Sequence, residues 1–309
     1  MRSAGRAPRR GGGHGRVSPV DAAVLDPRTG ECLGARLRRT TGRLLLAMAA
    51  LPAFAIAQEQ PLWELGLGVG ALRVPHYRGS DQDHGWVLPV PYFVYNGEVL
   101  KANREGARAM LFERGGVELE FSLTAGLPTR SKDDEARRGM DDLAPTVELG
   151  PNFIWSLARG TDWNLELRVP LRAALTVESS PHMIGWTSTP NLRLGLRPGG
   201  GWAVGLQAGP VWGSRRYNGY YYDVPNEDAR PERPAFESAS GWGGAQATGT
   251  LRRRFGRLWT GAFLRYDTVR GAVFDDSPLV QRRENLSFGV ALSWVFAASS
   301  RRGEADEAP

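Results

Sequence analysis

Three features that would point to familiar protein classes are scarce in this chain of 309 residues. It has one cysteine and four histidines, and nothing after residue 57 is apolar over the about 20 residues that a membrane-spanning helix needs. These scarcities exclude a disulfide-stapled fold and an α-helical membrane protein, and they leave no Cys/His spacing typical of a metal site. The cysteine, Cys32, precedes the apolar run at residues 44–56, so it is not placed as a lipoprotein anchor.

A surplus of one charge sign is also missing from most of the chain. The whole sequence has a net charge of +6, which by itself suggests an anionic partner such as nucleic acid. However, residues 1–57 contain ten arginines and three acidic residues. Removing them from the totals of 39 basic and 33 acidic residues leaves 29 basic and 30 acidic residues. The remainder is nearly neutral, and we expect no binding to nucleic acid.

The first 57 residues have the pattern of a secretory signal peptide behind an N-terminal extension. Four arginines between positions 36 and 43 precede the apolar run of residues 44–56 (LLLAMAALPAFAI), and Ala55-Ile56-Ala57 forms an A-x-A cleavage site. We predict cleavage before Gln58, which leaves an exported chain without cysteine. The sequence thus predicts three parts: extension and signal peptide over 1–57, a folded domain over 58–296, and a short polar tail over 297–309.

Strict alternation of apolar with small or polar residues dominates the exported chain. It is clearest over residues 284–296 (ENLSFGVALSWVF), where one face carries Leu286, Phe288, Val290, Leu292, Trp294 and Phe296. The other face carries Asn285, Ser287, Gly289, Ala291 and Ser293. Similar segments lie at residues 117–124, 163–172, 192–197 and 202–208. A period of two predicts β-strands whose two faces meet different surroundings.

The connections between these segments alternate in length. The long ones are residues 271–283, 214–239 and 127–144; between them fall short ones at 255–257, 198–200, 158–161 and 113–116, and an intermediate one at 178–183. Outer-membrane barrels alternate in this way because their periplasmic turns are short and their outer loops long, whereas a soluble β-sandwich has no reason to do so. Two short strands within residues 98–113, joined at residues 103–106, bring the total to about twelve strands; ten is the alternative.

We therefore predict an all-β fold, a transmembrane antiparallel up-and-down β-barrel in a bacterial outer membrane. In such a barrel the apolar set of each strand faces lipid and the polar set faces the lumen. Aromatic residues near the predicted strand ends, including Trp63, Trp155 and Trp212, are expected to form girdles at the two membrane interfaces.

The predicted lumen carries charges of both signs. The charged residues that the alternation directs inward are Glu118, Glu120, Glu148, Glu166, Arg168, Arg172, Arg193, Arg197, Arg265 and Asp267. Such a set is consistent with ion-paired packing of a narrow barrel or with a selective pore. We favour the ion-paired interior, with the pore as the alternative.

The remaining motifs indicate no catalytic chemistry. Residues 66–70 have glycine at every second position, but a nucleotide-binding fingerprint requires a strand, a turn and a helix in succession. His76, His84 and His182 fall on predicted outer loops without metal-ligand spacing. No serine–histidine pair is predicted on facing strands. We expect no enzymatic activity, no cofactor and no metal ion.

The longest predicted outer connection is unusual in its composition. This segment, residues 214–239, carries the aromatic residues Tyr217, Tyr220, Tyr221, Tyr222 and Phe236. Its three prolines lower the entropic cost of ordering it, and each aromatic ring buries a large apolar area when packed. We therefore expect a plug loop that folds over or into the mouth of the barrel; the alternative is a mobile surface loop.

Several segments resemble the MipA/OmpV family of outer-membrane proteins. They are residues 67–80 (LGVGALRVPHYRGS), 87–95 (VLPVPYFVY), 217–224 (YNGYYYDV), 234–236 (PAF), 240–244 (SGWGG) and 277–280 (SPLV), together with the aromatic-ended last strand. The resemblance runs from Trp63 to Phe296. It departs at the C-terminus, because the family usually ends at the terminal phenylalanine and this chain continues over residues 297–309.

The resemblance implies a non-enzymatic barrel. The founding member of the family is a scaffold between a lytic murein transglycosylase and a peptidoglycan synthase, and other members are described as adhesins or porin-like proteins. We therefore expect a scaffold, with a narrow pore or a surface adhesin as alternatives. The expected partners are outer-membrane lipid and lipopolysaccharide, the barrel assembly machinery, a murein transglycosylase and a peptidoglycan synthase. The resemblance also implies an assembly signal formed by Phe288, Val290, Leu292, Trp294 and Phe296.

Overall fold

The structure is a computed structural model that describes residues 61–97, 100–103 and 106–301. The predicted signal peptide over residues 1–57, the cleavage site before Gln58 and the end of the tail over residues 302–309 lie outside the described residues.

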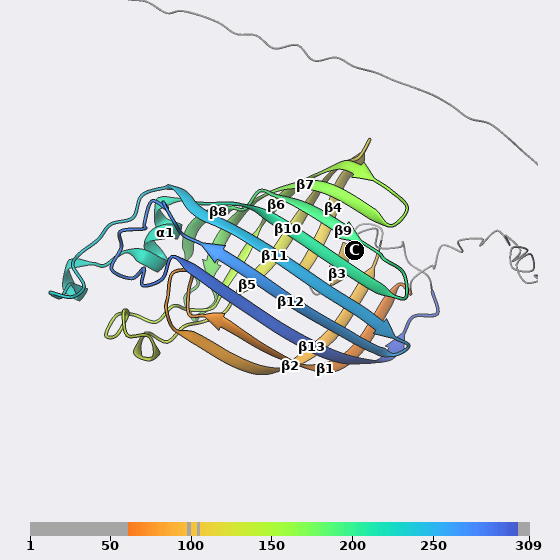
Figure 1. Cartoon of the computed structure of the whole chain (residues 1–309), viewed down its shortest axis with the longest axis horizontal. Helices are drawn as coiled ribbons and strands as arrows, with labels where there is room; N and C mark the ends of the chain where they lie inside the picture. The colour runs from red at the N-terminus through yellow and green to blue at the C-terminus, as the bar shows by residue number, and fades with distance from the viewer. Residues whose placement is uncertain (1–60, 98–99, 104–105, 302–309) are drawn as a thin grey trace, which may run out of the picture. The chain divides into compact units, whose positions relative to one another are not determined.

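One antiparallel sheet holds all the long elements (Figure 1). Its strands are β1 (Trp63–Pro75), β2 (Asp83–Asn96), β3 (Leu100–Asn103), β4 (Gly106–Arg114), β5 (Val117–Gly126), β6 (Thr146–Arg159), β7 (Trp163–Thr176), β8 (Met183–Ser188), β9 (Asn191–Leu196), β10 (Trp202–Gly213), β11 (Gly241–Phe255), β12 (Leu258–Thr268) and β13 (Glu284–Ala298). The strand pairings lead from β1 in chain order to β7, through β8 and β9 to β10 and β11, and through β12 and β13 back to β1.

Strands β8 and β9 occupy a single place in the barrel wall. β7 and β10 each pair with both of them, and the register against β7 is the same on either side of the break between Ser188 and Asn191. The break contains Pro190, which has no N–H to donate to a ladder. The thirteen strands of the described residues therefore fill twelve positions, which confirms the predicted antiparallel barrel of about twelve strands.

The two faces of the wall differ as the sequence predicts. On β13 the side chains of Phe288, Val290, Leu292, Trp294 and Phe296 are each about half exposed, at 48% to 59% of their full area. The alternating residues Asn285, Ser287 and Ser293 are buried. The apolar face is thus the outer one, as membrane-embedded barrels require. No helix in the described ranges is long and apolar enough to cross a membrane.

The connections separate the two ends of the barrel. Short turns join β4 to β5, β6 to β7, β9 to β10 and β11 to β12, while the connections at residues 127–145, 214–240 and 269–283 all lie at the other end. The 214–240 connection contains α1 (Arg215–Tyr222), and two short 3-10 helices, Ser131–Asp133 and Asn226–Asp228, lie in the long loops. By the rule for bacterial barrels, the short-turn end faces the periplasm and the long-loop end faces outward.

The last strand ends later than the sequence predicts. β13 continues to Ala298, which pairs with Glu64 of β1, so the first two residues of the predicted tail belong to the wall. Beyond it, the Ser299 N–H donates to the Trp63 carbonyl at 2.9 Å. The alternation of the sequence weakens after Phe296 because alanines follow, so the sequence alone places the end of the strand too early.

Candidate luminal site

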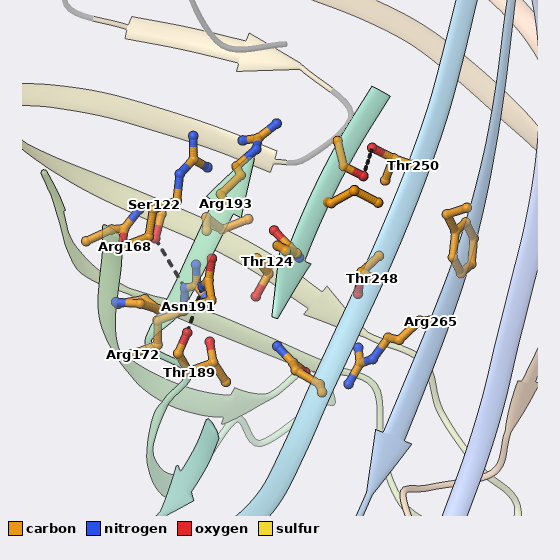
Figure 2. A pocket seen from close by; sticks show the side chains of 18 of the residues that line it. Ser122, Thr124, Arg168, Arg172, Thr189, Asn191, Arg193, Thr248, Thr250 and Arg265 are labelled. Carbon is orange, nitrogen blue, oxygen red and sulfur yellow. Dashed lines mark hydrogen bonds between the residues drawn. The ribbon is translucent and has the colours of Figure 1, made fainter. Parts of the chain in front are cut away.

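A cavity of about 590 Å³ lies inside the barrel, lined by β5, β6, β7 and β9–β12 (Figure 2). Hydroxyl and amide groups make up much of its wall: Ser122, Thr124, Asn152, Thr189, Asn191, Gln207, Gln246, Thr248 and Thr250. This cavity, called the luminal chamber below, arises because successive inward positions of these strands are polar. Its chemistry is that of a surface that forms hydrogen bonds to water or to a polar solute.

Arginines dominate the charge of the luminal chamber. Arg168, Arg172, Arg193 and Arg265 line it, and Glu120 is the one acidic residue among the described lining residues. Several of these cations are held by neighbours on the wall. A guanidinium nitrogen of Arg168 lies 2.7 Å from the Glu166 carboxylate, and the Nε of Arg172 donates to the Ser122 hydroxyl at 3.2 Å.

The ten predicted luminal residues do not all meet in this chamber. Five of them line it: Glu120, Arg168, Arg172, Arg193 and Arg265. Glu166 and Asp267 are buried beside it as ion-pair partners, because Asp267 lies within 3.0 Å of guanidinium nitrogens of both Arg265 and Arg78. The ion-paired interior that the sequence suggested is therefore present along part of the wall.

The other three lie away from the lining. Glu148 points toward the outer loops and accepts a hydrogen bond from the Tyr217 hydroxyl at 2.9 Å. Glu118 is half-buried on β5, two residues before Glu120. Arg197 is exposed in the turn after β9, where it lines a small cavity with Asp162 and Trp163. The alternation predicts an inward Arg197, but the strand already ends at Leu196, one residue earlier.

A buried network at the periplasmic end was missed by the sequence analysis. The Glu64 carboxylate is 4% exposed, accepts a hydrogen bond from the Tyr92 hydroxyl at 2.8 Å and lies 2.7 Å from a guanidinium nitrogen of Arg254. Arg254 is on β11, 190 residues further along the chain. A signal was available, because Glu64 is the one carboxylate on the inward, glycine-rich face of β1.

At the opposite end, four outer connections pack into a hydrophobic cluster, called the outer core below. It consists of Tyr77, Leu143, Tyr222, Val224, Val269, Ala272, Phe274 and Leu279, all at most 7% exposed. The ring of Tyr222 stacks on that of Phe274 with centroids 3.6 Å apart. The Tyr77 hydroxyl donates to the Leu279 carbonyl at 2.8 Å. Loops far apart in sequence are therefore held together as one packed unit.

Helix α1 seats the plug loop against the wall. Its N-cap, Ser214, accepts a hydrogen bond from the Tyr217 N–H, which satisfies a free donor of the first turn. The helix meets β8 at Gly185, whose φ is +130° and where a Cβ would lie 2.6 Å from the Tyr217 nitrogen. Only glycine fits both this backbone conformation and this close approach.

The five aromatic residues of the plug loop all have packed positions. Tyr217, Tyr221 and Tyr222 follow one another through ring contacts, Tyr222 belongs to the outer core, and Phe236 packs against it. The Tyr220 hydroxyl accepts a hydrogen bond from the Ala144 N–H at 2.8 Å. The loop is thus packed at the outer end of the barrel, and Tyr217 reaches from it to Glu148 on the wall.

Burial fixes the protonation of these tyrosines. Desolvation raises the pKa of Tyr217 well above its ordinary value of 10.0, and the nearby Glu148 carboxylate raises it further. Desolvation likewise raises the pKa of Tyr222 and of Tyr77. At neutral pH these phenols are therefore uncharged donors, which suits hydrogen bonds to a carboxylate or a carbonyl.

His76 takes part in a contact that holds two outer loops together. His76 Nδ1 and the Ser80 hydroxyl both contact the buried Asp134 carboxylate, at 2.9 and 2.8 Å. This arrangement ties the β1–β2 loop to residues 127–145, and it aims the serine hydroxyl at a carboxylate rather than at an imidazole. Within the part of the chain that the structure describes, no group of three His, Cys, Asp or Glu side chains is placed to hold a metal ion.

Comparisons with known proteins identify a family and several similar solved structures. A family model described as MltA-interacting protein MipA matches residues 67–296. A search of curated proteins found no significant match. Similar solved structures include the NanC porin (7% identity, TM-score 0.36, covering 74% of this chain and 98% of that one). An outer-membrane channel from Pseudomonas putida F1 has 13% identity and a TM-score of 0.41, with 75% and 96% coverage. Outer membrane phospholipase A from Escherichia coli has 12% identity and a TM-score of 0.30, with 76% and 94% coverage.

Proposed function

Because this chain belongs to the MltA-interacting protein MipA family of outer-membrane β-barrels, we propose that it is a non-enzymatic scaffold that holds a murein transglycosylase at the periplasmic side of the outer membrane. A peptidoglycan synthase is the proposed second partner. The scaffold would keep a hydrolase and a synthase of the cell wall next to each other, and its barrel would serve as the anchor.

The observation that carries this proposal is the packed outer core. A general pore needs a continuous water path, and the four outer connections that share one hydrophobic cluster would obstruct such a path at the outer end. Tyr217 and Glu148 further tie the plug loop to the wall. A barrel closed in this way is better suited to present a fixed surface than to pass solutes.

The surface available to a periplasmic partner is formed by the short turns. Arg159, Arg197 and Arg257 are exposed there, and so are the aromatic rings of Trp163 and Phe255. Arginine and aromatic side chains are the residue types most enriched in protein–protein interfaces. An arginine-rich surface also favours a partner with acidic groups, through faster and more specific association.

Binding to a purified murein transglycosylase tests the scaffold. The full chain, reconstituted in nanodiscs, should bind the soluble enzyme. Changing Arg197 and Arg257 together to glutamate should weaken that binding and reduce its salt dependence. Arg282→Glu is the matched control, because Arg282 is exposed on an outer loop. No binding by the parent protein, or equal weakening by the control, would reject the proposal.

A narrow pore is the second candidate, and the luminal chamber is the observation that favours it. Four arginines and a wall of hydroxyl and amide groups would suit a small anionic solute. Conductance of the parent protein in planar bilayers distinguishes the two. Steady, anion-selective conductance would favour the pore, whereas silence is expected of the scaffold.

A further inference from the structure

The wall of the barrel is incompletely paired along one side of β2. Strand β2 pairs with β1 from Asp83 to Tyr95, but it pairs with β3 only at Tyr95 and Asn96. Among the described residues, no strand pairs with the second side of β2 from Asp83 to Val94. Beyond the β3–β4 hairpin, the next strand along the wall is the end of β5, because β4 pairs with β5 only as far as Leu123.

The prolines of β2 stand where this missing partner would be. The Asn96 N–H donates to the Leu62 carbonyl, on the side of β1. Backbone N–H groups alternate in direction along a strand, and the β1–β2 register has no shift. Odd-numbered positions of β2 therefore direct their N–H groups away from β1, and two of these positions hold Pro89 and Pro91. Each proline removes a donor that would otherwise face hydrocarbon without a partner.

Between Trp86 and Val90 both faces of β2 are apolar, unlike those of the strands that line the chamber. Val87 is 75% exposed and Phe93 48%, on the outer face. The inner face carries Trp86, Leu88 and Val90, whereas the corresponding face of β5 carries Glu120, Ser122 and Thr124. Beside Leu88 and Val90, β1 presents Gly70 and Gly68, and Leu72 of β1 lies beside Trp86. The interior beside the unpaired edge is therefore apolar.

The gap between the unpaired edge of β2 and the end of β5 is called the seam below. Two cavities lie on the β5 side of it. The luminal chamber is lined by β5 residues up to Ala125. A second cavity of about 310 Å³ lies between the outer end of β2 and the loop that follows β5. Its apolar lining includes Val74, Trp86 and Leu127, and His84 and Arg130 lie in its polar part. The end of β5 thus separates a cavity inside the barrel from one at its outer rim.

From this arrangement we infer that the seam between β2 and the end of β5 holds an acyl chain of an outer-leaflet lipid. The acyl chain enters sideways past Pro89 and Pro91 and lies against Leu88 and Val90. The headgroup of the same lipid lies in the rim cavity near Arg130. The missing N–H groups remove the donors that strand addition requires, so a second copy of this chain is not the occupant. The seam lies in the apolar belt of the barrel, where lipid is the neighbouring molecule.

Photolabelling of the wild-type protein tests this occupant without altering the fold. The full-length protein is reconstituted in phosphatidylglycerol vesicles that contain a phospholipid with a diazirine in its acyl chain, irradiated, and analysed by peptide mass spectrometry. Adducts on the outward residues Val290 and Leu292 are the positive control, and Thr248 in the chamber is the inward control. Adducts on the inward residues Leu88 and Val90, at yields comparable to Leu292, are expected. Labelling of Leu292 without labelling of Leu88 and Val90 would overturn the inference.

A separate variant tests the position proposed for the lipid headgroup. Arg130→Ala should lower the yield at Leu88 and Val90 by about tenfold in phosphatidylglycerol vesicles, since a charge-assisted hydrogen bond to the phosphate is lost. Arg282→Ala, on a different outer loop, should leave it unchanged. Equal yields for Arg130→Ala and the parent would contradict the assigned headgroup site. In both variants, photolabelling of Leu292 is the control for correct folding.

Discussion

The hydroxyl of Tyr217 lies 2.9 Å from the carboxylate of Glu148, so that a residue of the plug loop is bonded directly to the barrel wall. The phenol is buried and neutral, and the Glu148 carboxylate accepts a hydrogen bond from it. The loop is thereby fixed at its inner side by this bond and at its outer side by the outer core. This double attachment is what the following predictions address.

Removing the Tyr217 hydroxyl should loosen the plug loop. Tyr217→Phe keeps the ring but leaves the Glu148 carboxylate without this donor, which is expected to cost about 1–3 kcal/mol of stability. Urea unfolding in detergent measures the loss. Tyr266→Phe is the control, because Tyr266 is an exposed outward-facing ring. Equal effects of the two variants would mean that the bond contributes nothing specific.

Deleting residues 218–236 should open the outer mouth. The deletion removes Tyr222 and Val224 from the outer core and takes away the helix that covers β8 and β10. Single-channel recordings of the parent are expected to be silent, and those of the deletion variant are expected to show conductance. A deletion variant as silent as the parent would argue against closure by this loop.

Stability should decrease at high pH, and the sign follows from the raised tyrosine pKa values. Folding raises the pKa of Tyr217 and Tyr222 above 10.0, so their contribution is complete below that pH. Above it the unfolded chain loses protons first, and the stabilisation is lost as the pH rises toward the folded values. Urea midpoints at about pH 8 and about pH 11 measure this change. A variant with phenylalanine at both positions should show a smaller decrease; an identical decrease would assign the effect elsewhere.

An arginine on the lipid face should be far more harmful than one in the lumen. Leu206 is 48% exposed on the outer face of β10, and its neighbour Gln207 lines the luminal chamber. Leu206→Arg is expected to cost about 2–4 kcal/mol near the bilayer midplane. Gln207→Arg should cost much less, because the chamber is already polar. Similar unfolding free energies in liposomes would mean that the faces are reversed.

Shortening the aromatic end of β13 should reduce the yield of folded barrel. Phe296→Ala removes an outward ring that is 58% exposed at the periplasmic end of the strand. Deleting residues 302–309 is the control, because it leaves β13 and its pairing with β1 intact. Heat-modifiable mobility on gels measures the folded fraction. A normal yield for Phe296→Ala together with failure of the deletion would assign the assembly signal to the tail.

The strands of the barrel wall and the orientation of their two faces could be predicted, because the alternation of residues along a strand is a local signal. The short hairpin β3–β4 was also predicted, since the segment at residues 103–106 has turn composition and an even strand count required it. The luminal arginines followed from the same alternation. Arg197 shows the limit of the method, because alternation alone does not tell where a strand stops.

The contacts that close the two ends were not predictable in the same way. The outer core joins Tyr77 to Leu279, and the periplasmic network joins Glu64 to Arg254, in each case across about 200 residues of sequence. Such pairs leave no periodicity, because each partner lies in a loop or at a strand end. The sequence predicted that the plug loop would pack, but not that Phe274 would be the ring against which it packs.

The hydrogen bonds that join the two ends of the sheet have a consequence for chain connectivity. The Leu62 N–H donates to the Arg301 carbonyl at 2.9 Å, so the first and last described segments meet at the periplasmic rim. A short peptide linker could therefore connect them without distorting the wall. A circularly permuted chain that begins in the turn between β6 and β7, at Thr161, would keep every strand pairing and place its new ends on the same side of the membrane. The order in which the strands are synthesised could then be changed without changing their order around the barrel, so that the effect of each on assembly could be measured separately.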